Sequence, residues 1–186
     1  MICMKTLVKI IWILFLVIFL VYLFLPNPEF PTHLPDALQS REPADTETTM
    51  RRAYFTNLDR EEVMTHYVKA FRVKSFLSFL VPTYRLNYPP EESASLIRDQ
   101  TRSTFLEEIT HPFRESIYIN GFEPKEDKDR IFIEEKEWRQ KIIVRYVPSN
   151  VRVRAVVGLL AFLLASILLK EWAFSISKFN HRKKHD

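Results

Sequence analysis

Three residues near the middle of the chain have types and a spacing that suit acid/base chemistry. Glu107 and Glu108 are adjacent, and His111 follows them in the densest polar stretch of the sequence, residues 98–115. A histidine titrates near neutral pH, and a nearby carboxylate can orient its ring. These residues are the candidate catalytic group, and an envelope enzyme that uses them, for instance a hydrolase, is one hypothesis. No nucleophile motif accompanies them, so a non-enzymatic role is favoured.

The spacing Glu108-x-x-His111 also occurs in carboxylate-bridged di-iron sites, where it lies on a helix. Such a site needs a second pair with this spacing and two further glutamates. Glu62 and His66 have a different offset, and Pro112 opposes a long helix at this point. We therefore predict no metal site.

Ion pairing offers a simpler interpretation of the same stretch. Arginines and acidic residues alternate there and can pair on a domain surface, where each exposed pair contributes little to stability. Protein interfaces favour arginine together with aromatic residues, and aromatic residues lie between these arginines in the sequence. The candidate binding residues are therefore Arg98, Arg102 and Arg114.

Composition excludes several classes of function. The chain has two glycines, Gly121 and Gly158, whereas dinucleotide sites and P-loops need several glycines to bring the backbone close to phosphate. Residues 26–150 carry 18 Lys and Arg against 21 Asp and Glu, so the net charge of +4 comes from the two ends of the chain. We expect no cofactor, and no nucleic-acid partner because that requires a basic folded face.

Residues 6–25 are the longest apolar stretch, and residues 1–5 precede it. After Lys9, sixteen residues follow without a charge, an amide, a glycine or a proline. Twenty helical residues are about 30 Å long, which matches the hydrocarbon core of a bilayer. The following Pro26-Asn27-Pro28 does not resemble a signal-peptidase site, so a retained signal-anchor is predicted instead of a cleaved signal peptide.

A second apolar stretch predicts another membrane helix at residues 151–174. Its uncharged part, residues 155–169, is only about 22 Å long, so flanking residues must extend it. The alternative is a buried helix of a soluble protein. Small residues on one side of this helix would let the first span pack closely. They are Ala155, Gly158, Ala161 and Ala165.

Basic residues predict the orientation in the membrane. Lys5 and Lys9 lie at the start of the first apolar stretch, and the tail at residues 175–186 is basic. Short segments rich in Lys and Arg stay in the cytoplasm. We expect both termini in the cytoplasm and residues 26–150 on the outer side of the cell membrane, although Arg152 and Arg154 argue the other way.

Between the apolar stretches, the pattern predicts a small α+β domain without cysteine. Residues 26–50 include five prolines and form either an extended spacer or an irregular strap on the domain surface. Residues 51–150 are expected to form two helices and a mostly antiparallel sheet of four or five strands.

Periodicity locates the elements of this domain. Asp59 suits a helix N-cap, and apolar residues recur at helical spacing as far as Phe71. A second helix is expected from Pro90 to about residue 100. Residues 76–81 are apolar without a clear period. Strands are predicted at 52–56, 83–88, 103–110 and 116–122, with a turn at Asn120-Gly121, and at 131–134 and 138–147 in a hairpin around 135–137.

Taken together, the sequence favours a double-spanning membrane protein whose α+β domain binds or scaffolds another membrane or envelope component. The expected partners are the lipid bilayer and a second protein, and a homo-oligomer is compatible with the sequence. The alternatives are the enzyme described above and an accessory subunit of a larger membrane complex.

Overall fold

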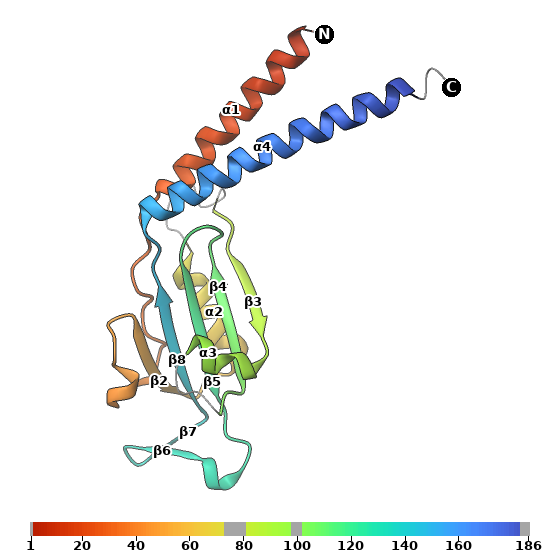
Figure 1. Ribbon diagram of the computed structural model, residues 1–186. Helices are drawn as coiled ribbons and strands as arrows, with labels where there is room; N and C mark the ends of the chain where they lie inside the picture. The colour runs from red at the N-terminus through yellow and green to blue at the C-terminus, as the bar shows by residue number, and fades with distance from the viewer. Residues whose placement is uncertain (1, 73–80, 98–101, 183–186) are drawn as a thin grey trace. The chain divides into compact units, whose positions relative to one another are not determined.

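The computed structural model describes residues 2–72, 81–97 and 102–182. These residues divide into two compact units, one formed by residues 26–149 and one by residues 1–25 and 150–186 (Figure 1). The expected α+β class is confirmed, because the described part contains four α-helices and an antiparallel sheet. The sheet has six strands, one more than the upper expectation.

The strands of the main sheet follow the order β1-β2-β8-β5-β4-β3, and every neighbouring pair is antiparallel. The last strand in the sequence, β8, lies between β2 and β5 and joins the two halves of the domain. The strands are β1 (Leu38–Gln39), β2 (Arg51–Thr56), β3 (Tyr84–Tyr88), β4 (Phe105–Thr110), β5 (Ser116–Phe122) and β8 (Gln140–Val147).

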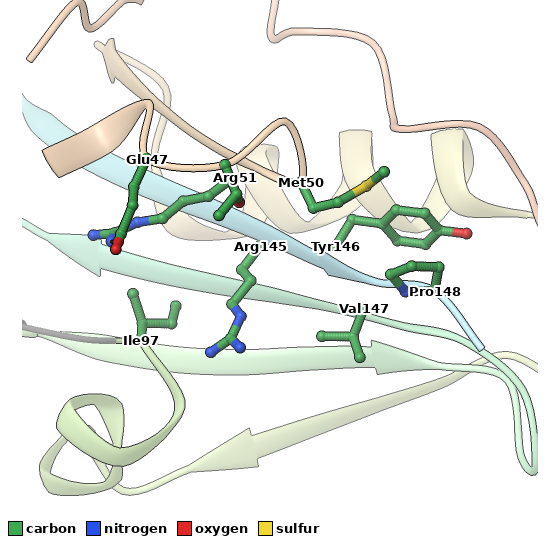
Figure 2. A pocket seen from close by; sticks show the side chains of 9 residues that line it. Glu47, Met50, Arg51, Ile97, Arg145, Tyr146, Val147 and Pro148 are labelled. Carbon is green, nitrogen blue, oxygen red and sulfur yellow. The ribbon is translucent and has the colours of Figure 1, made fainter. Parts of the chain in front are cut away.

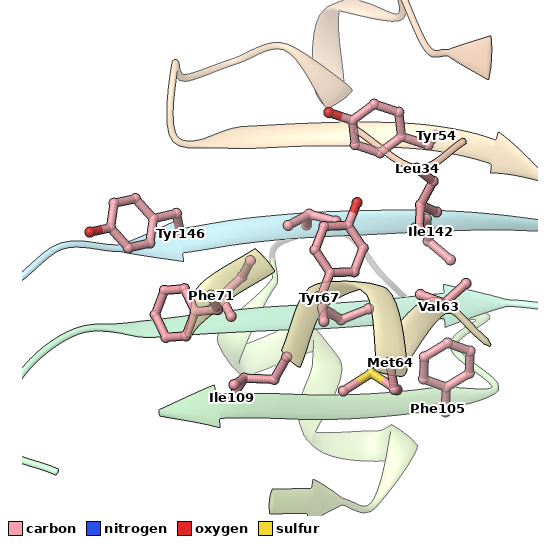
Figure 3. Close-up of a cluster of buried hydrophobic side chains, with 13 residues drawn as sticks. Leu34, Tyr54, Val63, Met64, Tyr67, Phe71, Phe105, Ile109, Ile142 and Tyr146 are labelled. Carbon is pink, nitrogen blue, oxygen red and sulfur yellow. The ribbon is translucent and has the colours of Figure 1, made fainter. Parts of the chain in front are cut away.

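One face of the sheet is covered by α2 (Arg60–Phe71). The predicted N-cap is confirmed. Asp59 accepts a hydrogen bond from the backbone of Glu62, whose carboxylate accepts one from the backbone of Asp59. This capping box fixes the start of the helix. The apolar side of α2 packs on inward residues of β4, β5 and β8, as Figure 3 shows for Tyr67, Phe71 and Ile109.

The opposite face of the sheet carries a smaller apolar cluster. Ala53, Leu106 and Ile143 lie there with Ile97, which follows the short helix α3 (Ser93–Leu96). The second helix was predicted from Pro90 to about residue 100, and its described part, residues 90–97, holds a 3-10 turn at Pro90–Glu92 and one turn of α-helix. Most of residues 76–81 lie outside the described residues, whereas Val81 is buried.

The proline-rich segment after residue 25 packs against the domain, as the strap alternative supposed. Leu34 is fully buried within the main core, and Phe30 packs against the same cluster. The Tyr146 hydroxyl donates a hydrogen bond to the Pro28 carbonyl at 2.8 Å. β1 then pairs with β2. These residues therefore belong to the domain and are not an extended spacer.

A hairpin forms close to the predicted residues 135–137, but the prediction that it pairs residues 131–134 with 138–147 is wrong. β6 (Ile131–Ile133) and β7 (Lys136–Trp138) form a separate two-stranded hairpin, and its turn is Glu134-Glu135. Both turn residues have positive φ, 52° and 62°, a conformation that usually selects Asn or Gly. Because glutamate is not typical of such turns, the sequence did not indicate a turn at Glu134-Glu135.

The turn predicted at Asn120-Gly121 is also wrong, because both residues continue β5. Gly121 is paired with Phe105 of β4, and the Phe105 ring occupies the space where a Cβ atom would stand. The glycine therefore serves close packing of an aromatic ring within the sheet.

The second unit contains α1 (Ile2–Phe24) and α4 (Val151–Arg182). Both are long and apolar enough to cross a membrane, over Thr6–Phe24 and Val151–Ile176. Their large apolar side chains are mostly exposed, for example Val8 at 61% and Leu168 at 68%.

The two helices contact each other directly. The Trp12 Nε1 atom donates a hydrogen bond to Ser166 Oγ at 3.0 Å, and the Trp12 ring stacks on Phe162 with centroids 4.8 Å apart. Gly158 lies against Leu23, and an added Cβ atom would clash with a methyl group of Leu23, so that side chain would have to shift. A glycine at this position allows close approach of the helices.

Burial of Leu34 makes the strap a contributor to stability. We expect Leu34→Ala to lower the free energy of unfolding by about 2–5 kcal/mol, because it leaves a cavity in the main core. Leu86→Ala is the matched control, since Leu86 is 41% exposed on the edge strand β3. Thermal unfolding of the full chain in detergent measures both. Equal melting temperatures for the two variants would show that the strap does not stabilise the domain.

Candidate functional site

The structure does not bring Glu107, Glu108 and His111 together. Glu107 and Glu108 are neighbours in β4, and successive residues of a strand project from opposite faces of the sheet. Glu107 shares the α2 face with Ile109, whereas Glu108 lies on the other face. His111 follows the end of β4. The strand predicted at residues 103–110 is confirmed by β4, so the Glu108-x-x-His111 spacing does not lie on a helix, as a di-iron site would require.

Glu107 is fully buried and forms the centre of an ion-pair network. Its Oε1 atom accepts hydrogen bonds from Arg60 Nε at 2.5 Å and Arg85 Nη2 at 2.8 Å, and Arg85 Nε also donates to Oε2. Arg85 donates two further bonds, each 2.7 Å long, to Glu61. The bonds to Glu61 and then those to Glu107 raise the pKa of Arg85. The network fixes α2 to β3 and β4.

Glu108 lies among tyrosines on the opposite face. The Tyr88 hydroxyl donates a hydrogen bond to Glu108 Oε2 at 2.5 Å, and this bond, together with burial, raises the pKa of Tyr88. Burial and the charge of Glu108 also raise the pKa of Tyr118. Both phenols therefore stay protonated at neutral pH, and Tyr88 holds the carboxylate as a hydrogen-bond donor.

His111 belongs to a different cluster, in the turn between β4 and β5. Its Nδ1 atom lies 2.8 Å from Glu115 Oε1, and its Nε2 atom lies 3.0 Å from Thr83 Oγ1. The ring is fully buried and stacks on Phe71, with centroids 4.7 Å apart. The imidazole of His111 therefore lies between a hydroxyl and a carboxylate, which is also the arrangement of groups in a Ser-His-Asp triad. Thr83 was missed as a partner because 28 residues separate it from His111, and Glu115 was missed although it is only four positions away.

Glu115 also binds Arg114. The Arg114 Nη2 atom lies 2.9 Å from Glu115 Oε1 and donates a second bond to the Pro26 carbonyl at 3.0 Å. Burial, the largest single effect, raises the pKa of Glu115, but the hydrogen bonds from His111 and Arg114 outweigh it, so the net shift is downward. The carboxylate stays ionised and ties the β4–β5 turn to the start of the strap.

The two candidate binding arginines that the structure describes, Arg102 and Arg114, do not share one surface. Arg114 is buried in the cluster just described, whereas the Arg102 side chain is 72% exposed and pairs with Asp129 at 3.0 Å. The two lie at opposite ends of β4. Arg98 lies outside the described residues.

In the predicted helix-packing group, Gly158 contacts α1 and Ala155 is buried. Ala161 and Ala165 are partly buried. Trp12 also contacts Ser166 and Phe162 of α4. The pattern of small residues did not predict these two contacts.

A pocket of about 450 Å³ lies on the sheet face opposite α2 (Figure 2). Arg51 of β2 and Arg145 of β8 line it, with Glu47 and an apolar wall that includes Ile97 and Val147. The sequence did not reveal this pocket, because the pairing of β2 with β8 joins residues 94 positions apart.

Among residues 2–72, 81–97 and 102–182, no group of three or more His, Cys, Asp or Glu side chains could hold a metal ion. Comparison of the chain with protein-family models, with curated proteins and with solved structures gives no match.

Glu115 makes the stability of the domain sensitive to acid. Its lowered pKa means that its contribution is complete above the unfolded-state pKa of about 4.3 and is lost as the pH falls through the lower folded-state value. Glu115→Gln should lower the free energy of unfolding by about 3 kcal/mol near pH 7, because it leaves the buried Arg114 without its partner charge.

Thermal unfolding of the full chain in detergent, measured from pH 7 to pH 3, checks this expectation. The gap in melting temperature between wild type and Glu115→Gln should narrow below about pH 4. Glu126→Gln is the control, because the Glu126 side chain is 65% exposed. A constant gap over the whole pH range would contradict the assignment.

Proposed function

We propose that the protein is a double-spanning membrane protein whose α+β domain, residues 26–149, binds another membrane or envelope component on the outer side of a cell membrane. The observation that carries this proposal is the apolar surface of α1 and α4. Large apolar side chains are exposed around both helices, such as Ile13 at 61% and Leu164 at 60%. Apolar surface of this extent is unfavourable in water and suits lipid.

The contacts between the helices support a paired anchor. Inside a bilayer, helices associate through close packing and hydrogen bonds between side chains. Gly158 supplies the close approach, and the bond from Trp12 to Ser166 supplies the polar contact. An accessory subunit of a larger complex would use the remaining helix surface for its own interface.

The basic tail and the short basic N-terminal segment support cytoplasmic termini. With two spans, residues 26–149 then face the outer side. Binding is favoured for this domain because the buried groups Glu107, Arg114 and Glu115 already pair with each other or with neighbouring strands. These charges hold the fold, and the open pocket beside Arg145 remains accessible.

Cysteine labelling tests the membrane arrangement. In a Cys3→Ser background, Lys128→Cys should react with a membrane-impermeant maleimide in intact cells, because Lys128 is exposed in the domain. Lys178→Cys, beyond the end of the second candidate span, should react only after permeabilisation. The protein should also stay in the membrane pellet after alkaline carbonate extraction. Labelling of both sites in intact cells, or release into the supernatant, would contradict the proposal.

Hydrolysis is a second candidate function, supported by the arrangement Thr83–His111–Glu115. Thr83 is partly exposed, whereas His111 and Glu115 are fully buried, so a substrate would have to approach from the side of Thr83. In such a triad the imidazole takes the hydroxyl proton and the carboxylate orients the ring. The clustered glutamates originally expected with His111 have no part in this arrangement.

Turnover of an activated ester such as p-nitrophenyl acetate tests the second candidate. Thr83→Ala and His111→Ala should each lower kcat by about a thousandfold or more, whereas Thr83→Ser should keep activity. Far-ultraviolet circular dichroism checks that the variants fold. A wild-type rate equal to that of Thr83→Ala would remove hydrolysis as a function of this cluster.

A further inference from the structure

Two arginines face each other across neighbouring strands of the sheet. Arg51 of β2 and Arg145 of β8 are direct cross-strand partners, so their side chains project from the same face. Like charges in directly opposite positions destabilise a sheet. An arrangement that costs stability points to a functional requirement. Here it points to a ligand with negative charge.

Arg51 is unusual because it is both charged and buried. Its side chain is 8% exposed, and its Nε atom has no hydrogen-bond partner among the described residues. The nearest paired acid is Glu47, with Nη1 and Oε2 3.5 Å apart, which is longer than the roughly 2.7–2.9 Å of a close charged hydrogen bond. Glu47 is 51% exposed. Figure 2 shows Glu47 beside Arg51, with Arg145 on the adjacent strand.

The wall of the pocket is apolar. Met50, Ile97, Val147 and Pro148 line it beside the two arginines. A volume of about 450 Å³ lies within the common range of small-ligand sites. Paired guanidinium groups recognise phosphate and carboxylate through parallel hydrogen bonds. A ligand that satisfies every side of the pocket therefore combines an anionic group with carbon chains.

We propose that this pocket binds the phosphate headgroup of an anionic membrane lipid, with Arg51 and Arg145 on the phosphate and the first acyl carbons on the apolar wall. The lipid source rests on the proposed membrane function. Chain length also supports it. Pro148 is three residues before the first residue of α4, so its Cα atom lies within about 11 Å of the start of that candidate span.

Calorimetric titration of the full chain in a nonionic detergent tests the proposal. The probes are dihexanoyl phosphatidic acid, dihexanoyl phosphatidylcholine and inorganic phosphate. The phosphatidic acid should bind more tightly than either other probe, because it alone joins a net negative headgroup to acyl chains. Arg145→Gln should weaken its binding at least tenfold, and Arg130→Gln, which removes an exposed arginine outside the pocket, should change it less than twofold.

A second pair of variants tests the apolar wall. Val147→Asp puts a carboxylate beside the arginines and should abolish binding, whereas Phe132→Asp changes an exposed apolar residue of β6 and should not. Equal affinity for inorganic phosphate and phosphatidic acid would overturn the lipid assignment. Binding that is insensitive to Arg145→Gln would overturn the site itself. If Lys128→Cys is labelled from outside while no probe binds, the proposed function stands and only the lipid site falls.

Discussion

The Glu115 carboxylate is the group on which most of one end of the domain depends. It binds His111 and Arg114, and these two residues extend its reach to Thr83, to the Phe71 ring and to the Pro26 carbonyl. This one buried charge therefore connects four segments of the domain. They are the turn between β4 and β5, the residue before β3, the end of α2 and the start of the strap. Removing one member of a buried ion pair is costly, because the other charge remains without solvent or partner. A cluster of this kind fixes geometry even if its net contribution to stability is small.

The rest of the domain is held together by the pairing of strands in the main sheet. β8 pairs along most of its length with both β2 and β5, so the final strand of the domain holds together segments that lie far apart in sequence. The same strand supplies core residues to both faces. Ile142 and Val144 pack under α2, and Ile143 packs in the smaller cluster on the opposite side. The position of Arg145 beside Arg51 is a direct consequence of this register.

Local signals in the sequence predicted local structure well. Asp59 marked the start of α2, and unbroken apolar stretches marked α1 and α4. Features that depend on distant partners were not predictable. Gly121 was assigned to a turn because Asn-Gly is a common turn pair. The Phe105 ring that requires a glycine here belongs to another strand, so the local sequence does not reveal it. Glu107, Glu108 and His111 looked like one group because they are close in sequence, but a strand separates its neighbours onto opposite faces. The pocket beside Arg51 and the partners of His111 arise from pairing over long sequence distances, which no spacing rule captures.

The two ends of the domain are fastened to each other. The Asn27 side chain donates a hydrogen bond to the Ser149 carbonyl at 2.9 Å, although 122 residues separate them. The points at which the polypeptide enters and leaves the domain are therefore neighbours in space. Adjacent termini are the feature that makes insertion of one domain into another chain tolerable.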